Sequence, residues 1–291
     1  MTNRSRHTPE SPTVVVTGVS TGIGLAIARV LVRHNVHVFG SVRRAADGDC
    51  VRAELGTGFT PLLFDVTDPA AIQAAVPVVA ERLRGRTLWG LVNNAGIGVG
   101  GPLIHQPLDE VRRILEVNVI GALAATQAFA PLLGTDRARS GQPGRIVNIS
   151  SVAGRMSAPF LGAYAASKRA LEGMSHSLRR ELMVYGIDVI IVNPGSVVTP
   201  IWDKVEMADG SRYAETEYAP VLARFLAAAL KSGRSGLPPE AVGDVVWTAL
   251  SSARPRTFYP VLRRKLLHWT IPLALPARVL DRLIAKRLGM K

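Results

Sequence analysis

The chain has very little cysteine. Cys50 stands alone among 291 residues, which excludes an internal disulfide framework and any metal site built from several cysteines. A single thiol is also typical of proteins that fold in a reducing compartment. Since 47% of the residues are hydrophobic, we predict a protein held together by a sizeable core and without a bound metal.

Long apolar runs are scarce as well. No stretch reaches the roughly 18 uninterrupted apolar residues of a membrane-spanning helix. The most apolar segment near the carboxyl terminus, 266–277, is short and contains two prolines. Residues 1–12 are polar and lack the apolar core of a secretory signal, so we expect a disordered leader there. The sequence therefore predicts a cytoplasmic protein, with membrane contact limited to its periphery.

Acidic residues are few near the carboxyl terminus. Over the whole chain 35 Lys and Arg face 22 Asp and Glu, a net charge of +13. Residues 254–291 contain ten basic residues and a single acid, Asp281, and so hold +9 of that excess. The rest of the chain is nearly neutral, and no nucleic-acid-binding motif accompanies the charge. The excess therefore indicates a local basic surface and not a nucleic-acid-binding protein.

The basic residues lie in an amphipathic extension, 261–291. Its apolar residues recur at helical spacing and share one face, with the charged side chains elsewhere; they are Leu280, Leu283, Ile284 and Leu288. Two interpretations stay open. The helix packs beside a substrate loop or a partner subunit, or it lies on a membrane surface.

Strand-length apolar runs alternate with longer segments of helical period. The first run is 13–17, a helical segment 24–32 follows, and the order repeats up to the run 187–192. Continuous Val and Ile predict strands buried on both faces, and strands separated by helices predict parallel pairing. We predict a single α/β domain, 13–260, with a Rossmann-type, doubly wound parallel sheet between helices. The rhythm lapses over about 196–238, which we interpret as a substrate loop.

A glycine-rich turn joins the first predicted strand to the first predicted helix. Gly18 allows the tight turn, Gly22 lets the backbone approach a pyrophosphate, and Gly24 lets the helix pack closely on the strand. The amino end of the helix attracts the anion. The strand–turn–helix context therefore predicts a dinucleotide site. The turn reads Thr17-Gly18-Val19-Ser20-Thr21-Gly22-Ile23-Gly24.

Further motifs follow in a set order along the chain. Asn93-Asn94-Ala95-Gly96 closes one predicted strand, and Asn193-Pro194-Gly195 follows a later one. With the TGxxxGxG turn and with Asn118, Ser151, Tyr164 and Lys168, these motifs resemble the short-chain dehydrogenase/reductase family over about 13–200. The segment 200–204 and the extension look more like the hydroxysteroid and retinol dehydrogenase branch than the compact 3-oxoacyl-carrier-protein reductases.

Tyr164 and Lys168 are four residues apart, so they share one helical face. We expect the Lys168 ammonium to lie beside the phenol and lower its pKa toward the working pH, which suits a general acid or base. The resemblance implies that Ser151, and not its neighbour Ser150, holds the substrate oxygen. It also implies that Asn118 holds a water that relays protons from Lys168, although a buried Asn could instead tie structural elements together.

No acid directly follows the second predicted strand, where a carboxylate would select NAD(H). Arg43 and Arg44 stand there, so we predict NADP(H), with Ser41 and Arg43 as phosphate ligands and Arg44 as a helper or a solvated charge. By resemblance, Asp65 contacts the adenine edge and Thr199 the carboxamide. The full predicted cofactor set is Gly18, Ser20, Thr21, Gly22, Ile23, Gly24, Ser41, Arg43, Arg44, Asp65, Val66, Asn93, Ala95, Gly96, Tyr164, Lys168, Pro194, Gly195, Val197 and Thr199.

The residues predicted to contact the substrate are mostly apolar, which favours a lipophilic, steroid- or retinoid-like ketone or secondary alcohol. They are Ser151, Met156, Phe160, Tyr164, Ile201 and Trp202. We therefore predict hydride transfer between NADP(H) and such a substrate. A 3-oxoacyl or hydroxy-acid substrate is the alternative within the family, and a non-catalytic NADP-sensing protein is the alternative outside it. The resemblance also implies a homodimer or homotetramer built on 108–133 and 164–184.

Overall fold

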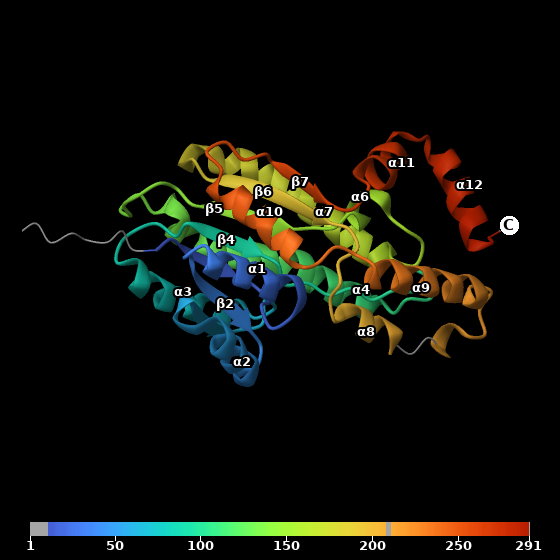
Figure 1. Cartoon of the computed structure of the whole chain (residues 1–291), viewed down its shortest axis with the longest axis horizontal. Helices are drawn as coiled ribbons and strands as arrows, with labels where there is room; N and C mark the ends of the chain where they lie inside the picture. The colour runs from blue at the N-terminus through green and yellow to red at the C-terminus, as the bar shows by residue number, and fades with distance from the viewer. Residues whose placement is uncertain (1–10, 208–210, 291) are drawn as a thin grey trace, which may run out of the picture.

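Seven parallel strands form one sheet at the centre of the protein. The computed structural model describes residues 11–207 and 211–290 (Figure 1); of the predicted leader, residues 1–10 lie outside the described residues. The strand order is β3-β2-β1-β4-β5-β6-β7, which confirms the predicted doubly wound sheet. The strands are β1 (Thr13–Val16), β2 (His37–Val42), β3 (Phe59–Leu63), β4 (Gly90–Asn93), β5 (Arg145–Ile149), β6 (Asp188–Pro194) and β7 (Phe258–Val261).

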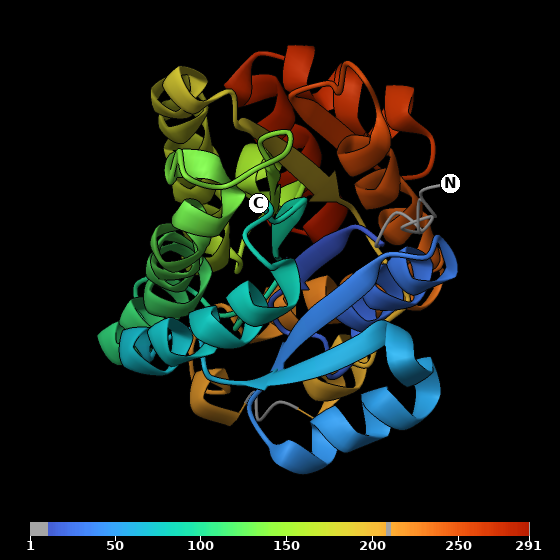
Figure 2. The same cartoon turned by 90° about the vertical axis from the view of Figure 1, so that its left-hand side faces the viewer.

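Helices cover both faces of this sheet (Figure 2). On one face lie α1 (Gly22–Arg33) and α10 (Glu240–Ser251). On the other lie α3 (Pro69–Leu83), α5 (Gly121–Ala130) and α7 (Gly162–Glu181). The other α-helices are α2 (Ala45–Leu55), α4 (Leu108–Leu115), α6 (Ala153–Met156), α8 (Ile201–Glu206), α9 (Ala219–Arg234), α11 (Ile271–Ala274) and α12 (Ala277–Leu288). The 3-10 turns are η1 (Gly56–Gly58), η4 (Leu182–Tyr185) and η5 (Ser211–Tyr213), and the π-helical turns are η2 (Glu116–Ile120), η3 (Pro131–Thr135) and η6 (Leu266–Thr270).

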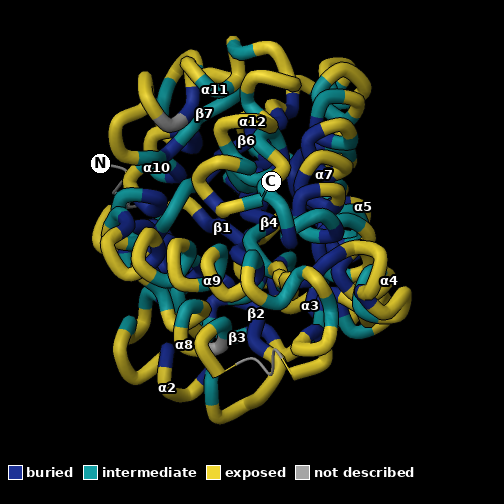
Figure 3. The backbone as a smooth tube through the Cα atoms, turned by 90° about the vertical axis from the view of Figure 1, so that its right-hand side faces the viewer, coloured by how far each residue is buried: buried dark blue, intermediate teal, exposed yellow. Residues whose placement is uncertain are grey.

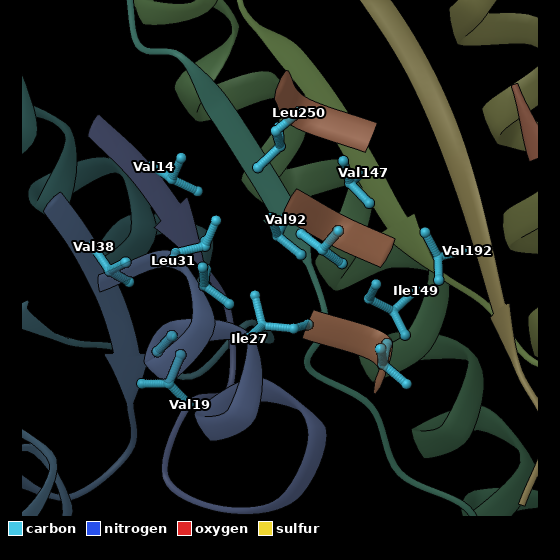
Figure 4. Packing of buried hydrophobic residues seen from close by; sticks show 14 of the residues in the cluster. Val14, Val19, Ile27, Leu31, Val38, Val92, Val147, Ile149, Val192 and Leu250 are labelled. Atoms are coloured by element: carbon cyan, nitrogen blue, oxygen red, sulfur yellow. The ribbon is translucent and has the colours of Figure 1, made fainter. Parts of the chain in front are cut away.

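The first strand shows why its sequence has no polar alternation. Successive side chains of a strand point to opposite faces of the sheet. Val14 and Val16 pack in the same core cluster as Ile27 and Leu31 of α1 (Figure 4). Val15 belongs to the cluster on the other face. All three valines are fully buried, so an uninterrupted Val run is the pattern of a strand covered on both sides.

One helical segment is long and apolar enough, by length and composition, to cross a membrane. It runs over Leu108–Thr135, through α4, η2, α5 and η3, and no second one occurs in the described part of the chain. Phe129, Leu132 and Leu133 of this segment are buried in the cluster that contains Val15. The segment therefore packs on the sheet as a core helix of the domain does.

The stretch 196–238 holds more regular structure than we predicted. α9 alone takes up 16 of its residues, and α8 precedes it. The helical pattern of α9 is weak in the sequence because its side chains do not reach the main core, and the role of the stretch as a substrate loop stays a prediction. Leu222 of α9 instead forms a small separate cluster with Phe160 and Tyr213, and such satellite clusters are weak signals in a sequence.

The extension folds into η6, α11 and α12, which lie on the same side of the molecule as α9 (Figures 1 and 3). Within the predicted apolar face of α12, Leu288 is buried and Leu283 is 53% exposed. Arg224 of α9 donates hydrogen bonds to the carbonyl oxygens of Leu288, at 2.7 Å, and Gly289, at 3.3 Å. One side of α12 therefore packs against the protein, and another side is left exposed.

The close packing of α1 on the turn after β1 predicts the effect of Gly24→Ala. A methyl group there would overlap the Gly18 carbonyl oxygen and the Asn94 amide, so we expect the free energy of unfolding to fall by about 1–3 kcal/mol. Urea unfolding measures this loss. Gly173→Ala in α7 is the matched control, because no atom lies within 4 Å of the position of its new methyl group. Equal effects of the two substitutions would contradict the prediction.

Candidate active site

The strand order reverses between β1 and β4. From β1 the sheet continues through β2 to β3 on one side, and from β4 to β7 on the other. The loops after β1 and β4 therefore leave the sheet in opposite directions and open a crevice at the carboxyl ends of the strands. Open α/β sheets bind their ligands in such a crevice.

The glycine-rich turn approaches the neighbouring loops too closely for side chains. Gly18 has φ +70°, and a methyl group on it would lie 2.9 Å from Cα of Ala95. Gly22 has φ +63°, and a methyl group there would lie 3.5 Å from the Thr199 side chain. Both glycines have left-handed backbone angles that other residues rarely adopt, and they leave the amino end of α1 without side chains, which fits a pyrophosphate group.

Asn94 fastens this turn, a role that our sequence interpretation missed. Its amide nitrogen donates to the carbonyl oxygens of Thr17 and Gly18, both at 2.9 Å. In return, Thr17 Oγ1 accepts from the backbone nitrogens of Asn94 and Ala95, both at 3.0 Å. The sequence places Asn94 directly after a predicted strand. That strand is known to lie beside β1 only once the sheet order is known.

A cavity of about 410 Å³ lies beside the turn, lined by Ser20, Thr21, Arg43, Arg44 and Asp47. Arg44 donates to both carboxylate oxygens of Asp47, at 3.0 and 2.7 Å, and this hydrogen bonding lowers the pKa of Asp47. Arg43 is 67% exposed and lies 3.9 Å from Asp65. Of the two guanidiniums, that of Arg43 is therefore the freer to bind a ligand.

Ser41 and Asp47 make contacts near this cavity that the sequence did not predict. Ser41 is buried, and its hydroxyl accepts a hydrogen bond from the Gly18 nitrogen at 2.9 Å, so it braces the turn against β2. Its role as a phosphate ligand stays a prediction. Asp47 was not among the predicted residues, and it reaches the cavity because α2 begins at Ala45, directly after the two arginines.

The other predicted cofactor residues lie along or beneath the crevice. Asp65 Oδ1 accepts hydrogen bonds from the nitrogen and the hydroxyl of Thr67, both at 3.0 Å. The Asn93 side chain points into the core, where it donates to Thr126 at 3.0 Å and Asn148 at 2.8 Å; only its main chain is available to a ligand. The remaining positions are the buried Val66, Pro194 and Val197 and the more accessible Ile23, Gly96 and Gly195.

The predicted catalytic residues Ser151, Tyr164 and Lys168 lie together after β5 and on α7. Ser151 lies close enough to Tyr164 to influence the pKa of its phenol, and Ser151 Oγ accepts a hydrogen bond from the Ala153 nitrogen at 3.1 Å. Lys168 is buried. Its Nζ lies 5.8 Å from the centre of the Tyr164 ring and donates to the Ile149 carbonyl at 2.9 Å.

The pKa of Tyr164 differs from our prediction. Burial raises the pKa of the phenol, and the nearby Ser151 hydroxyl offsets only part of that rise. Burial also lowers the pKa of Lys168 to about 8. The direction of the Tyr164 shift is therefore opposite to the one we expected from Lys168, because burial disfavours the charged phenolate. The phenol thus keeps its proton near neutral pH, as a general acid must.

Asn118 lies in the π-helical turn η2, and π turns often mark functional positions. Its amide nitrogen donates to the Ile97 carbonyl and the Ser167 hydroxyl, both at 2.9 Å, and its oxygen accepts from the Ile97 nitrogen at 2.8 Å. The side chain therefore ties the loop after β4 to α7, which is the second of the two roles considered. The predicted proton relay through a bound water stays a prediction.

Glu172 is a buried carboxylate that the sequence interpretation missed. It is 2% exposed and lies four residues after Lys168 on α7. Asn193 donates to it at 2.6 Å and to the Ser151 carbonyl at 3.1 Å, and Arg155 donates to its other oxygen at 2.7 Å. A buried charge requires such partners, and here the partners hold the segment that carries Ser151. The only signal was the helical spacing from Lys168.

Two of the apolar residues predicted to contact the substrate also pack against α9 or bond to the loop before α8. Phe160 has φ +63°, and its ring packs against Tyr218 and Phe225, with centroids 6.0 and 5.5 Å away. Trp202 donates from Nε1 to the Val197 carbonyl at 2.7 Å. Phe160 and Trp202 thus help to position α8 and α9. The other two predicted residues are Met156, which is half-buried, and Ile201, which is 44% exposed.

Comparison with known proteins shows the family of the chain. Residues 12–209 match the family model described as short chain dehydrogenase. An NADPH-dependent 3-dehydrocapnine reductase of Ornithobacterium rhinotracheale is 38% identical over 94% of this chain and 96% of its own length. Retinol dehydrogenase 16 of Mus musculus is 33% identical over 84% of this chain and 79% of its own. The crystal structure of a short-chain dehydrogenase from Streptomyces avermitilis has a TM-score of 0.73 at 28% identity, covering 95% of this chain and 94% of the other.

The chain therefore belongs to the short-chain dehydrogenase/reductase family, as its motifs predicted. It is an oxidoreductase that acts on alcohol or ketone groups with a nicotinamide dinucleotide.

The buried Lys168 predicts that stability rises with pH. Its pKa is about 8 in the folded chain and near 10.5 without burial, so between these values the unfolded state binds more protons. The free energy of unfolding then increases by about 1 kcal/mol per pH unit from about pH 8 to 10. Tyr164, whose pKa is raised, acts in the opposite sense only above about pH 10. Urea unfolding at both ends of this range tests the rise, which Lys168→Met should abolish. A variant with the wild-type slope would contradict the assignment.

Proposed function

We propose that the protein is an NADP(H)-dependent oxidoreductase that transfers a hydride between the nicotinamide and a lipophilic ketone or secondary alcohol. The grouping of Ser151 and Tyr164 with the buried Lys168, whose Nζ lies 5.8 Å from the centre of the Tyr164 ring, carries this proposal. This grouping supplies a phenol that exchanges a proton next to a crevice suited to a dinucleotide.

The bound dinucleotide supplies or accepts the hydride. Backbone nitrogens around Gly22 would hold its pyrophosphate, and Thr199 would bind the carboxamide. Arg43, Arg44, Ser20 and Thr21 offer guanidinium and hydroxyl donors in one cavity, and donors of this kind favour a 2′-phosphate. Asp47, the acid in that cavity, is already engaged by Arg44. These contacts, with the NADPH-dependent relative, support NADP(H) over NAD(H).

The protein's own residues then move the proton. Ser151 donates a hydrogen bond to the substrate oxygen, since its Oγ already accepts from the Ala153 nitrogen. Tyr164 gives its phenolic proton to that oxygen in reduction and takes it back in oxidation. The Lys168 ammonium stabilises the phenolate left behind, because an opposite charge lowers the cost of an ion in a buried site. Asn118 holds the relay that returns a proton from solvent through Lys168.

Apolar surroundings support a lipophilic substrate. Met156, Phe160, Ile201 and Trp202 are the residues that we predict to line the substrate site, and apolar lining favours apolar ligands. A methyl group on Gly98 would lie 3.2 Å from the Tyr164 ring, so glycine at this position keeps the face of the ring accessible. The relatives named as a 3-dehydrocapnine reductase and a retinol dehydrogenase support a ketone or an alcohol as the reacting group.

Removal of the Tyr164 hydroxyl tests the mechanism. We expect Tyr164→Phe to lower kcat for ketone reduction by about 10²–10⁴-fold, the usual contribution of a general acid, with NADPH binding retained. NADPH absorbance, followed with steroid, retinoid and 3-oxoacyl ketones, measures the rate. Tyr185→Phe is the matched control, since Tyr185 lies in η4, just before β6 and away from the carboxyl ends of the strands. Wild-type turnover in the Tyr164 variant would contradict the proposed mechanism.

Substitution of Arg43 tests the cofactor preference. We expect Arg43→Ala to weaken NADPH binding by about 10–100-fold, as loss of a charged hydrogen bond implies, and to leave NADH binding nearly unchanged. Titration by NADPH and NADH fluorescence measures both affinities. Arg52→Ala, on the same helix as Asp47 but not among the cavity residues, is the control. Equal affinity of the wild type for the two cofactors would contradict the preference.

A further inference from the structure

Exposed apolar side chains gather on the extension. They occur on each of its helical parts, η6, α11 and α12, within a segment of only 30 described residues, 261–290. Leu266 and Leu267 on η6 are 67% and 52% exposed, and Leu283 on α12 is 53% exposed. The others are Ile271, Leu273 and Val279.

The apolar residues of α12 form two rows at helical spacing. The inner row, Leu280, Ile284 and Leu288, is half-buried to buried against the protein. The outer row, Val279 and Leu283, is exposed. Arg224 holds the carboxyl end of the helix on α9. The inner row already makes the contact between α12 and the rest of the protein. That contact therefore does not explain why Val279 and Leu283, in the outer row, are apolar.

Basic side chains surround these apolar residues. Arg278, Arg282 and Lys286 flank the outer row of α12, and all three are exposed. Arg263, Arg264 and Lys265 directly precede Leu266 and Leu267 and are exposed as well. Asp281 is the one acidic residue among 261–290. A surface that combines apolar side chains with an almost uniform positive charge complements an anionic lipid layer.

The mouth of the candidate active site adds further exposed apolar groups. Leu103 and Ile104 follow β4, and Val198, Ile201 and Met207 follow β6. Loops that follow parallel strands leave the sheet at the same edge, and the extension follows β7 at that edge. Figure 3 views the molecule from this side, with α12 and the carboxyl terminus in front and α9 beside them.

We propose that this edge of the molecule docks on an anionic lipid bilayer through the extension. The exposed leucines of η6 and the outer row of α12 enter the interfacial layer, and the flanking arginines and lysines bind lipid headgroups. The docking itself does not depend on the proposed function. One consequence rests on that function: a lipophilic substrate dissolved in the bilayer would reach Tyr164 through a mouth that faces the membrane.

Sedimentation of the full chain with lipid vesicles tests the docking. We expect the protein to pellet with phosphatidylcholine vesicles that contain roughly a third phosphatidylserine, and to stay in solution with phosphatidylcholine alone. We also expect binding to weaken as salt rises, because screening shortens the reach of the charges. Equal binding to both vesicles, or binding to neither, would overturn the proposal.

Two variants of the extension separate the contributions of charge and apolar surface. The triple change Arg263→Glu, Arg264→Glu and Lys265→Glu should weaken the partition by about a hundredfold. The pair Leu266→Ser and Leu267→Ser should weaken it by about tenfold or more. The matched control is Met183→Ser with Val184→Ser, since these residues are 70% and 68% exposed but precede β6 at the opposite edge. Variants that pellet like the wild type would overturn the proposal.

Turnover of a water-soluble ketone without vesicles distinguishes this proposal from the proposed function. We expect the extension variants to keep the wild-type rate, because their substituted residues lie outside the predicted catalytic and cofactor-binding sets. Lipid binding by a wild type that turns over no ketone would overturn the proposed reaction and support the docking. A dimer that buries the extension and ignores vesicles, detected by light scattering, would overturn the docking.

Discussion

The hydrogen bonds between Thr17 and Asn94 join the two halves of the sheet. The two residues are 77 positions apart, and they meet only because β1 and β4 are neighbours at the point where the strand order reverses. Their contacts hold the glycine-rich turn against the loop after β4, at a separation that a side chain at Gly18 or Gly24 would prevent. That same loop then reaches the catalytic residues, since a methyl group on Gly96 would lie 3.2 Å from Asn118 and 3.4 Å from Lys168. This junction thus positions the glycine-rich turn and also the loop that packs against Asn118 and Lys168.

Buried polar groups then give the site its rigidity. Lys168, Asn118 and Glu172 are each buried on or beside α7, and each is hydrogen-bonded to the backbone or to other side chains. In a low-dielectric interior a satisfied network is stiff, because any rearrangement would leave a polar group unpaired. The side chains around Ser151 and Tyr164 are therefore held in place before a substrate arrives, which is the condition for efficient proton transfer.

The extension is connected to this network. Arg155, which is paired with Glu172, lies over the Phe258 ring at 4.6 Å, and Phe258 stacks with Trp269 at 5.7 Å. Met290 packs beside the cluster of Phe160, Tyr213 and Leu222. The extension therefore contacts the domain at both of its ends, next to the catalytic segment and next to α9. The exposed outer row of α12 therefore belongs to a segment that contacts the domain at both of its ends.

Periodicity and local spacing were enough to predict the parallel sheet, the dinucleotide turn and the common face of Tyr164 and Lys168, because each depends on residues a few positions apart. Such spacing does not predict the structural roles of Asn94, Glu172 and Ser41, because their hydrogen-bond partners lie far along the chain and are known only from the fold. The direction of the Tyr164 pKa shift also required the fold. An attraction between two side chains can be read from their spacing, but the cost of removing both from water depends on every element that packs around them.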